Sequence, residues 1–224
     1  MASFPLQATP SQTAERYKQS AAESAAMLVT DRSRVGLGTG STVNYLLPAL
    51  AARKLDLRCV ATSPATERAA RELGLNIVDL DELGELDIAI DGADQIDPQG
   101  WLIKGGGAAH TREKIVAAAA ERFVVIASAE KSVSALSGPV PLEILRFGCQ
   151  STLAALAPAR LRDVPPSPDG GLIADYLGEV DDPAQLAERL SLTPGVVEHG
   201  LFAPTLVSDI LIAGEQGIEH RRIA

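Results

Sequence analysis

The chain has 224 residues, of which 46% are hydrophobic and 22% are charged, and its formal net charge at pH 7 is −9. A chain of this length and composition can bury a substantial core, which argues against wholesale disorder. The excess of acidic residues argues against a general nucleic-acid-binding protein and against adhesion to an anionic membrane, because both need a basic face.

The first sixty residues predict two helices and two strands. Small and apolar side chains recur every three or four positions over residues 10–29, which predicts a helix, with Thr9 as its cap and Pro10 in its first turn. Residues 34–37 predict a short strand that glycines end. A helix is predicted from Ser41, and Pro48 should kink or shorten it. Residues 57–61 predict a second strand.

The alternation continues to residue 127. Ser63 and Pro64 are typical of a helix start, and Gly74 of the helix end. Further strands are predicted over residues 76–78, 86–90, 101–103 and 123–127, with a turn at Gln99-Gly100 and a helix over residues 111–121. Strands that alternate with helices indicate a parallel sheet covered on both faces.

After about residue 136, prolines punctuate the chain and the alternation stops. A hairpin turn is predicted at Gly170-Gly171, a helix over residues 182–190, and a strand after Pro194. The apolar residues 207–213 predict one more strand, which can return to the main sheet. We therefore expect an α/β fold: a doubly wound, mainly parallel sheet with helices on both faces, plus a smaller inserted α+β lid domain. The expected domains are residues 1–135 with 206–224, and residues 136–205.

The cysteines and the N-terminus indicate a cytoplasmic protein. Cys59 and Cys149 suit a reducing compartment and have neither disulfide-framework nor zinc-site spacing. The first ten residues have no basic region followed by an apolar one, so we expect a short tail rather than a signal peptide. The sequence contains no apolar run of about 18 residues, so we predict no transmembrane helix.

The first candidate site is GLGTGST, residues 36–42, between a strand and a helix. Glycines let the backbone approach a ligand closely, and Thr39, Gly40, Ser41 and Thr42 precede free N–H groups at a helix start, an arrangement that suits a phosphate. A plain tight turn is the alternative. A dinucleotide site would need an acidic residue at the end of the second strand, where residues 60–63 have none, so a small phosphorylated ligand is favoured.

The second candidate site is Asp91-Gly92-Ala93-Asp94, at the end of an apolar strand. In open α/β sheets, ligands bind beyond the carboxyl ends of the strands. Two carboxylates around a glycine suit either metal binding or acid–base work, and a solvated turn is the structural alternative. The three histidines are too dispersed to indicate a metal site, so no metal is predicted.

The third candidate is Lys104-Gly105-Gly106-Gly107, followed by Glu113 in the first turn of a helix. Backbone amides of such a loop can form an anion nest, and the lysine adds a point charge, which suits an oxyanion that develops during reaction. The alternatives are a flexible hinge for the loop and ordinary helix-start chemistry for Glu113. Lys131 follows the next strand and can reach the same sheet edge.

Taken together, GLGTGST, DGAD, KGGGA, TREK and the later PGVVEHGLF resemble ribose-5-phosphate isomerase of the A type. The motifs occur in the same order and span about residues 12–220. That family interconverts ribose 5-phosphate and ribulose 5-phosphate without a metal or organic cofactor, and it forms dimers or tetramers. The stretch 154–169 departs from the family pattern, because it is proline-rich and shorter.

The resemblance implies a role for each candidate residue. Residues 39–42, 91–94 and 104–107 correspond to three substrate loops, and Glu113 to the proton acceptor. Lys131 corresponds to a substrate-contacting lysine, and Lys18 to a lysine near the phosphate. Lys104 and the amides after it would then stabilise an enediolate. Asp91 could act on the ring oxygen or O1, and Asp94 could orient Lys104 or a hydroxyl.

Two other functions remain open on sequence grounds. One is a sugar-phosphate sensor that regulates transcription, although the residues before the first strand predict one helix rather than a DNA-reading helix-turn-helix. The other is a different enzyme on the same scaffold, such as an amino-sugar phosphate deaminase or an acyl-CoA transferase. The partner expected in each enzymatic case is a small molecule, with no nucleic acid and no membrane.

Overall fold

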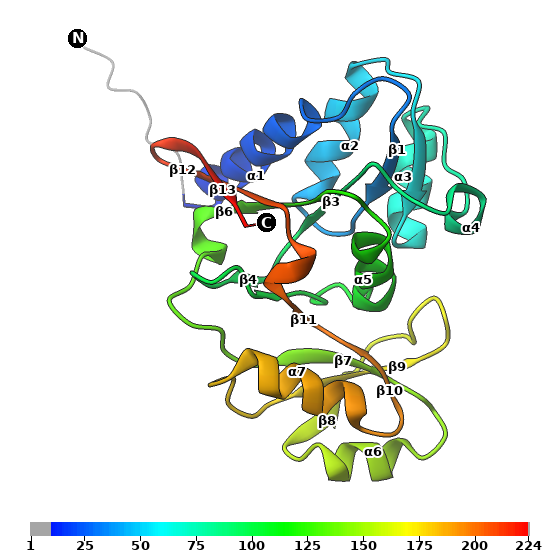
Figure 1. The fold of residues 1–224 in the computed structure, drawn as a ribbon, viewed down its shortest axis with the longest axis vertical. Helices are drawn as coiled ribbons and strands as arrows, with labels where there is room; N and C mark the ends of the chain where they lie inside the picture. Colours follow the sequence, from blue (N-terminus) through cyan, green and yellow to red (C-terminus); the bar gives the residue numbers. More distant parts are fainter. Residues whose placement is uncertain (1–9, 224) are drawn as a thin grey trace.

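The computed structural model describes residues 10–223, so the expected cap Thr9 and the expected N-terminal tail lie outside the described residues. A larger part holds the N-terminal helices and the main sheet, and a smaller part lies below it in the view of Figure 1. Within the described residues, no helix combines the length and the apolar character needed to cross a membrane.

The main sheet has six strands in the order β13-β12-β6-β3-β1-β2. All neighbouring pairs are parallel except β12 with β13, which is antiparallel. Every residue of β6 is buried, as expected for a central strand with both faces covered. The strands are β1 (Arg34–Leu37), β2 (Arg58–Ala61), β3 (Ile88–Gly92), β6 (Phe123–Ser128), β12 (Asp209–Gly214) and β13 (Gly217–Arg222).

The two faces of this sheet bury separate apolar cores. Val124 and Ile126 point into the core under the helices α1 (Pro10–Ala26), α2 (Val43–Ala52) and α3 (Pro64–Glu72). Phe123 and Val125 point the other way, as alternation along a strand requires. Their core is closed by α5 (His110–Ala118) and by a three-stranded sheet of β4 (Gln95–Ile96), β5 (Leu102–Ile103) and β11 (Leu201–Phe202).

The smaller part is built on a four-stranded antiparallel sheet in the order β10-β7-β9-β8. The chain leaves the main sheet after β6 through the short helix η1 (Ala129–Lys131), and returns through β11 and the short helix η2 (Pro204–Leu206) to β12 beside β6 (Figure 1). The elements between are β7 (Val140–Ile144), α6 (Cys149–Ala155), β8 (Ala159–Leu161), β9 (Leu172–Tyr176), α7 (Pro183–Leu192) and β10 (Val196–His199).

The expected α/β class, with a mainly parallel sheet covered on both faces, is confirmed, and the details differ at several elements. The helix expected from Ser41 begins at Val43. The strand expected over residues 76–78 is reduced to one bridge between Ile77 and Cys59. The turn expected at Gly170-Gly171 lies in the connection between the antiparallel strands β8 and β9, which form a hairpin with a long loop. Elements without a sequence-based prediction include α4 (Leu80–Leu83), α6, β7, β8 and β13.

The strand order places one crevice in a defined position. Because β2 lies on one side of β1 and β3 on the other, the order reverses between β1 and β3. The loops that follow these two strands open there, and such a switch point is where open α/β sheets bind ligands.

Candidate active site

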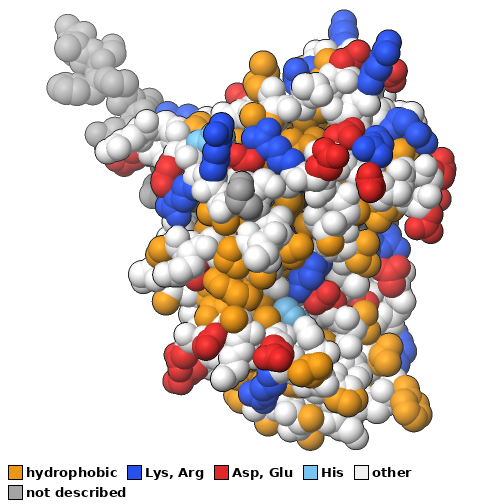
Figure 2. All heavy atoms as spheres, in the orientation of Figure 1, with side chains coloured by type: hydrophobic (Ala, Val, Ile, Leu, Met, Phe, Trp, Pro, Cys, Tyr) orange, Lys and Arg blue, Asp and Glu red, His pale blue; other side chains and the backbone are white. Residues whose placement is uncertain are grey.

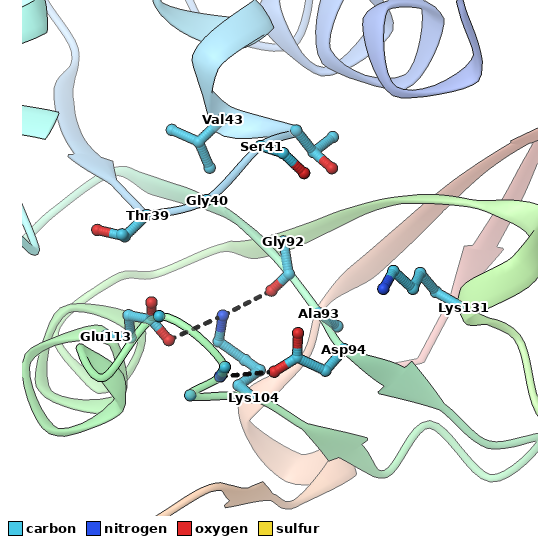
Figure 3. Close-up of a pocket in the computed structure, with 14 residues that line it drawn as sticks. Thr39, Gly40, Ser41, Val43, Gly92, Ala93, Asp94, Lys104, Glu113 and Lys131 are labelled. Carbon is cyan, nitrogen blue, oxygen red and sulfur yellow. Dashed lines mark hydrogen bonds and ion pairs between the residues drawn. The ribbon is translucent and has the colours of Figure 1, made fainter. Parts of the chain in front are cut away.

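One pocket opens at this switch point and draws residues from five segments (Figure 3). The segments are the loop after β1 with the first turn of α2, the loop after β3, the loop between β5 and α5, α5 itself, and η1. The lining residues are Thr39, Gly40, Ser41, Thr42, Val43, Gly92, Ala93, Asp94, Lys104, Gly105, Gly106, Gly107, Glu113 and Lys131.

The loop after β1 is held against the loop after β3. The Thr39 N–H donates to Asp91 Oδ1 over 3.0 Å, and the Gly92 N–H donates to the same oxygen over 2.7 Å. A Cβ at position 38 would lie 1.9 Å from that oxygen, so only glycine permits this approach. The Thr39 hydroxyl is fixed by Thr62 at 2.8 Å. This loop therefore enters α2 in one orientation, with the free N–H groups of the helix start beside the pocket.

A buried lysine forms the base of the pocket. Lys104 Nζ lies 2.9 Å from Asp91 Oδ2 and 3.1 Å from Glu113 Oε2, and the three side chains are at most 4% exposed. The same ammonium donates to the Gly92 carbonyl over 2.5 Å. Lys104 directly follows β5, and its N–H donates over 2.8 Å to the carbonyl of Gly200, the residue before β11. One cation thus bridges two carboxylates away from solvent.

Burial and mutual charge set the proton affinities of this cluster. Burial first, and the negative charge of Asp91 second, raise the pKa of Glu113 to about 8. Burial also raises the pKa of Asp91, although Lys104 opposes this rise. Burial alone would lower the pKa of Lys104, but the two carboxylates outweigh it and the pKa lies above its ordinary value. Glu113 is therefore a carboxyl group that exchanges a proton near neutral pH, as a general base must.

The glycine loop and Lys131 complete the walls. Gly105 has a φ of +104°, a conformation that side chains rarely adopt. The Gly106 N–H donates to Asp94 Oδ2 over 2.8 Å, which ties the glycine loop to the loop after β3. Figure 3 shows Lys131 extending from η1 on the side of the pocket that holds Ser41 and Asp94. The wall opposite Glu113 therefore carries a cation and a helix start, which suit an anionic group.

The structure brings together almost every residue singled out in the sequence. Asp91 is the exception among the loop residues, since it lies behind Lys104 and does not line the pocket. It is Asp91 that holds Lys104, whereas the carboxylate of Asp94 accepts from Gly106. Lys18 pairs with Glu15 at 2.6 Å and is not among the lining residues.

Three contributors were missed in the sequence. Val43 lines the pocket, Thr62 anchors Thr39, and the ring of Phe202 lies 5.4 Å from Lys104 Nζ. Thr62 directly follows β2, and that position was a signal, because strand ends share the edge that carries the site. Val43 and Phe202 are apolar and offered no signal beyond their place next to a motif.

Comparison with known proteins agrees with this geometry. The family model of ribose 5-phosphate isomerase A (phosphoriboisomerase A) matches residues 58–217. The chain belongs to this family. It is 45% identical to ribose-5-phosphate isomerase A of Caulobacter sp. (strain K31), over 92% of this chain and 97% of that protein.

Solved structures of ribose-5-phosphate isomerases extend the likeness to more than nine-tenths of the chain. Ribose 5-phosphate isomerase A from Neisseria gonorrhoeae superposes with a TM-score of 0.90 at 32% identity, covering 95% of this chain and 98% of that one. A D-ribose-5-phosphate isomerase in complex with phospho-erythronic acid superposes with a TM-score of 0.88 at 32% identity, covering 93% and 99%. The loop at residues 39–42 precedes the family-model match, and these superpositions cover nearly all of the chain.

Proposed function

We propose that this chain interconverts ribose 5-phosphate and ribulose 5-phosphate, as an aldose–ketose isomerase of the pentose phosphate pathway. The observation that carries the proposal is the buried carboxyl group of Glu113, paired with Lys104 at the base of a pocket that both glycine loops line. Membership of the ribose 5-phosphate isomerase A family supports the choice of substrate.

In the proposed reaction, Glu113 moves one proton between neighbouring carbons. The carboxylate takes the proton from C2 of the open-chain aldose, which leaves an enediolate, and returns it to C1 to give the ketose. Such a base contributes about 10²- to 10⁴-fold to rate. A pKa near 8 makes Glu113 a strong enough base for a weakly acidic C–H bond while it still ionises near neutral pH.

Lys104 and the glycine-loop amides would stabilise the enediolate. Before the reaction, the ammonium of Lys104 is shared between Asp91 and Glu113. When Glu113 accepts the proton it loses its charge and releases its hold on the ammonium, just as negative charge develops on the substrate oxygen. Removal of one such donor typically costs about 10²- to 10³-fold in rate.

The phosphate group would bind away from the reacting carbons, between Lys131 and the first turn of α2. It does not react, but its binding energy holds the sugar so that proton transfer becomes effectively intramolecular. The net charge of −9 makes this local positive region necessary for a dianionic substrate. We expect no metal to take part. Within residues 10–223, no three His, Cys, Asp or Glu side chains are grouped to hold one.

The same proposal covers assembly, domains and location. Seven large apolar side chains are exposed in the smaller part, and their burial against a second copy of the chain would favour a homodimer or homotetramer. They are Leu145, Phe147, Leu161, Val164, Leu177, Leu192 and Val197. Hydrophobic side chains are visible over that part in Figure 2. We assign residues 1–135 and 206–224 to a catalytic domain and residues 136–205 to a lid domain. The free cysteines fit the cytoplasm.

A coupled assay with ribose 5-phosphate in the presence of a chelator tests the proposal. We expect ribulose 5-phosphate to form at an undiminished rate with the chelator present. Amino-sugar phosphates and acyl-CoA substrates, assayed in parallel, should give no turnover. Turnover of one of those compounds and none with ribose 5-phosphate would overturn the assignment.

A further inference from the structure

The glycine loop of the pocket is gripped from the smaller part of the molecule by one arginine. Arg162 follows β8, and its Nη1 donates to the carbonyl oxygens of Gly105 over 3.1 Å and Gly106 over 3.3 Å. The arginine lies 57 residues from Gly105 along the chain and does not line the pocket. It therefore contacts the back of the loop whose front lines the pocket.

The guanidinium is itself held in one orientation. Arg162 Nε donates to Asp175 Oδ2 over 3.1 Å, and its Nη2 donates to Asp175 Oδ1 over 2.5 Å. Asp175 lies in β9, and its side chain is 11% exposed. A side-on pair of this kind fixes the plane of the guanidinium. The remaining nitrogen then points at the glycine loop in a set direction.

The hydrogen bonds from Arg162 to two carbonyl oxygens also fix the directions of the N–H groups in the same peptides. In a trans peptide the C=O of one residue and the N–H of the next point in opposite directions. With the Gly105 carbonyl turned to Arg162, the Gly106 N–H must point to the pocket side, where it meets Asp94 at 2.8 Å. With the Gly106 carbonyl turned to Arg162, the Gly107 N–H must also point away from the smaller part.

The loop has few other restraints. Three successive glycines have wide conformational freedom, and the described part of the chain provides no acceptor for the Gly107 N–H. The Gly105–Gly106 peptide has two further restraints, because its carbonyl also accepts from the Ala108 N–H over 3.1 Å and its N–H donates to Asp94. Among the described residues, the Gly106–Gly107 peptide is held by the arginine alone, so without Arg162 this peptide plane can rotate and the Gly107 N–H loses its direction.

We propose that Arg162, locked by Asp175, is a positioning residue that aims the Gly107 N–H at the reacting oxygen of the substrate, while the Gly106 N–H stays on Asp94. The inference rests on the proposed isomerase function, since it assigns the Gly107 amide to the enediolate. It also makes the smaller part of the chain a component of the active site, because that part supplies both Arg162 and Asp175. We call this pair the clamp.

Steady-state kinetics and amide hydrogen exchange of purified full-length variants test the clamp. We expect Arg162→Ala to lower kcat about 10- to 100-fold, because small displacements of transition-state donors have costs of this size. The KM for ribose 5-phosphate should change less than about threefold, since the phosphate contacts lie elsewhere. Exchange at the Gly106 amide, which Asp94 protects, should become faster, while exchange in β6 stays unchanged.

Three further variants separate geometry from charge and from folding. Asp175→Asn should reproduce the loss of kcat, and the double variant should be no slower than Arg162→Ala, because both changes break one unit. Arg162→Lys keeps the charge but lacks the planar fork, so it should remain slow. The matched control is Arg160→Ala, an exposed arginine on β8, which should be fully active.

The outcomes distinguish this inference from the proposed function. If the wild type does not isomerise ribose 5-phosphate, the proposed function fails, and unchanged exchange at Gly106 in Arg162→Ala would still overturn the clamp independently. If the wild type is active and Arg162→Ala or Arg162→Lys keeps at least half of its kcat, the clamp is refuted and the isomerase assignment stands.

Discussion

Replacement of Glu113 by glutamine separates the catalytic value of the carboxyl group from its cost to stability. The amide keeps nearly the same shape and fits the same buried space, but it cannot accept a proton from carbon. We expect kcat to fall about 10²- to 10⁴-fold. Substrate binding should stay nearly unchanged, because the proposed phosphate site, between Lys131 and the start of α2, does not include Glu113. Such a pattern marks an interaction made only in the transition state.

The same substitution should raise stability, and the size of the effect depends on pH. A tenfold change in proton affinity corresponds to about 1.4 kcal/mol. The rise in the pKa of Glu113 from 4.5 to about 8 disfavours its ionised form in the folded state by on the order of 5 kcal/mol. The folded state binds this proton more tightly than the unfolded state. The resulting contribution to stability is therefore complete below pH 4.5 and is lost as pH rises through about 8.

Urea unfolding at pH 5 and pH 9 measures this difference. The free energy of unfolding of Glu113→Gln relative to the wild type should increase by a few kcal/mol between the two pH values. The control is Glu72→Gln, which removes an exposed glutamate from the end of α3 and should show no such trend. A near-normal kcat in Glu113→Gln would show that Glu113 is not the catalytic base. A stability difference that does not grow with pH would refute the buried-charge reasoning.

Two further substitutions test the electrostatics of the pocket. Asp91→Asn removes the neighbouring charge that helps raise the pKa of Glu113, so the acid limb of the kcat/KM profile should move to lower pH; a limb that stays in place, measured by the coupled assay across pH 5–9, would contradict this coupling. Lys131→Ala should raise the KM for ribose 5-phosphate about 10-fold or more with a smaller change in kcat, because it removes one charge from the proposed phosphate site; a normal KM at low salt would place the phosphate elsewhere.

The main sheet and the site loops were predictable because each rests on a local pattern with one physical meaning. The run over residues 123–127 is apolar throughout, and only a strand with both faces covered tolerates that, as β6 shows. The loops at residues 39–42 and 91–94 follow parallel strands, and such strands end at the same edge of a sheet. Convergence of the loops therefore followed from the alternation itself.

The smaller sheet was less predictable because its strands break the usual composition rules. β7 contains Pro141, which cannot donate to a ladder, and the buried Glu143, which is accepted only because Thr111 and Ser167 bond its carboxylate. These partners lie 32 and 24 residues away. Likewise, no local pattern shows that Asp91 turns beneath Gly38 to hold Lys104, since that depends on how the loops pack.

The buried triad of Asp91, Lys104 and Glu113 is best explained by catalysis rather than stability. Burying ions is costly, and replacing a buried ionic group with uncharged residues of similar volume is often neutral or stabilising by about 1–4 kcal/mol. Removing one partner is different, because an unpaired charge remains. Lys104→Met should therefore lower the free energy of unfolding by about 3–5 kcal/mol at pH 8.

The triple variant Asp91→Asn, Lys104→Met, Glu113→Gln should recover most of that loss, or exceed the stability of the wild type, while it remains inactive. Urea unfolding of both variants at one pH makes the comparison. If the triple variant is as unstable as Lys104→Met alone, the ion pairs are needed for the stability of the fold. Catalysis alone would then not explain why the three charges are retained. If it is as stable as the wild type, the three charges are retained for the chemistry they perform, since the fold does not need them.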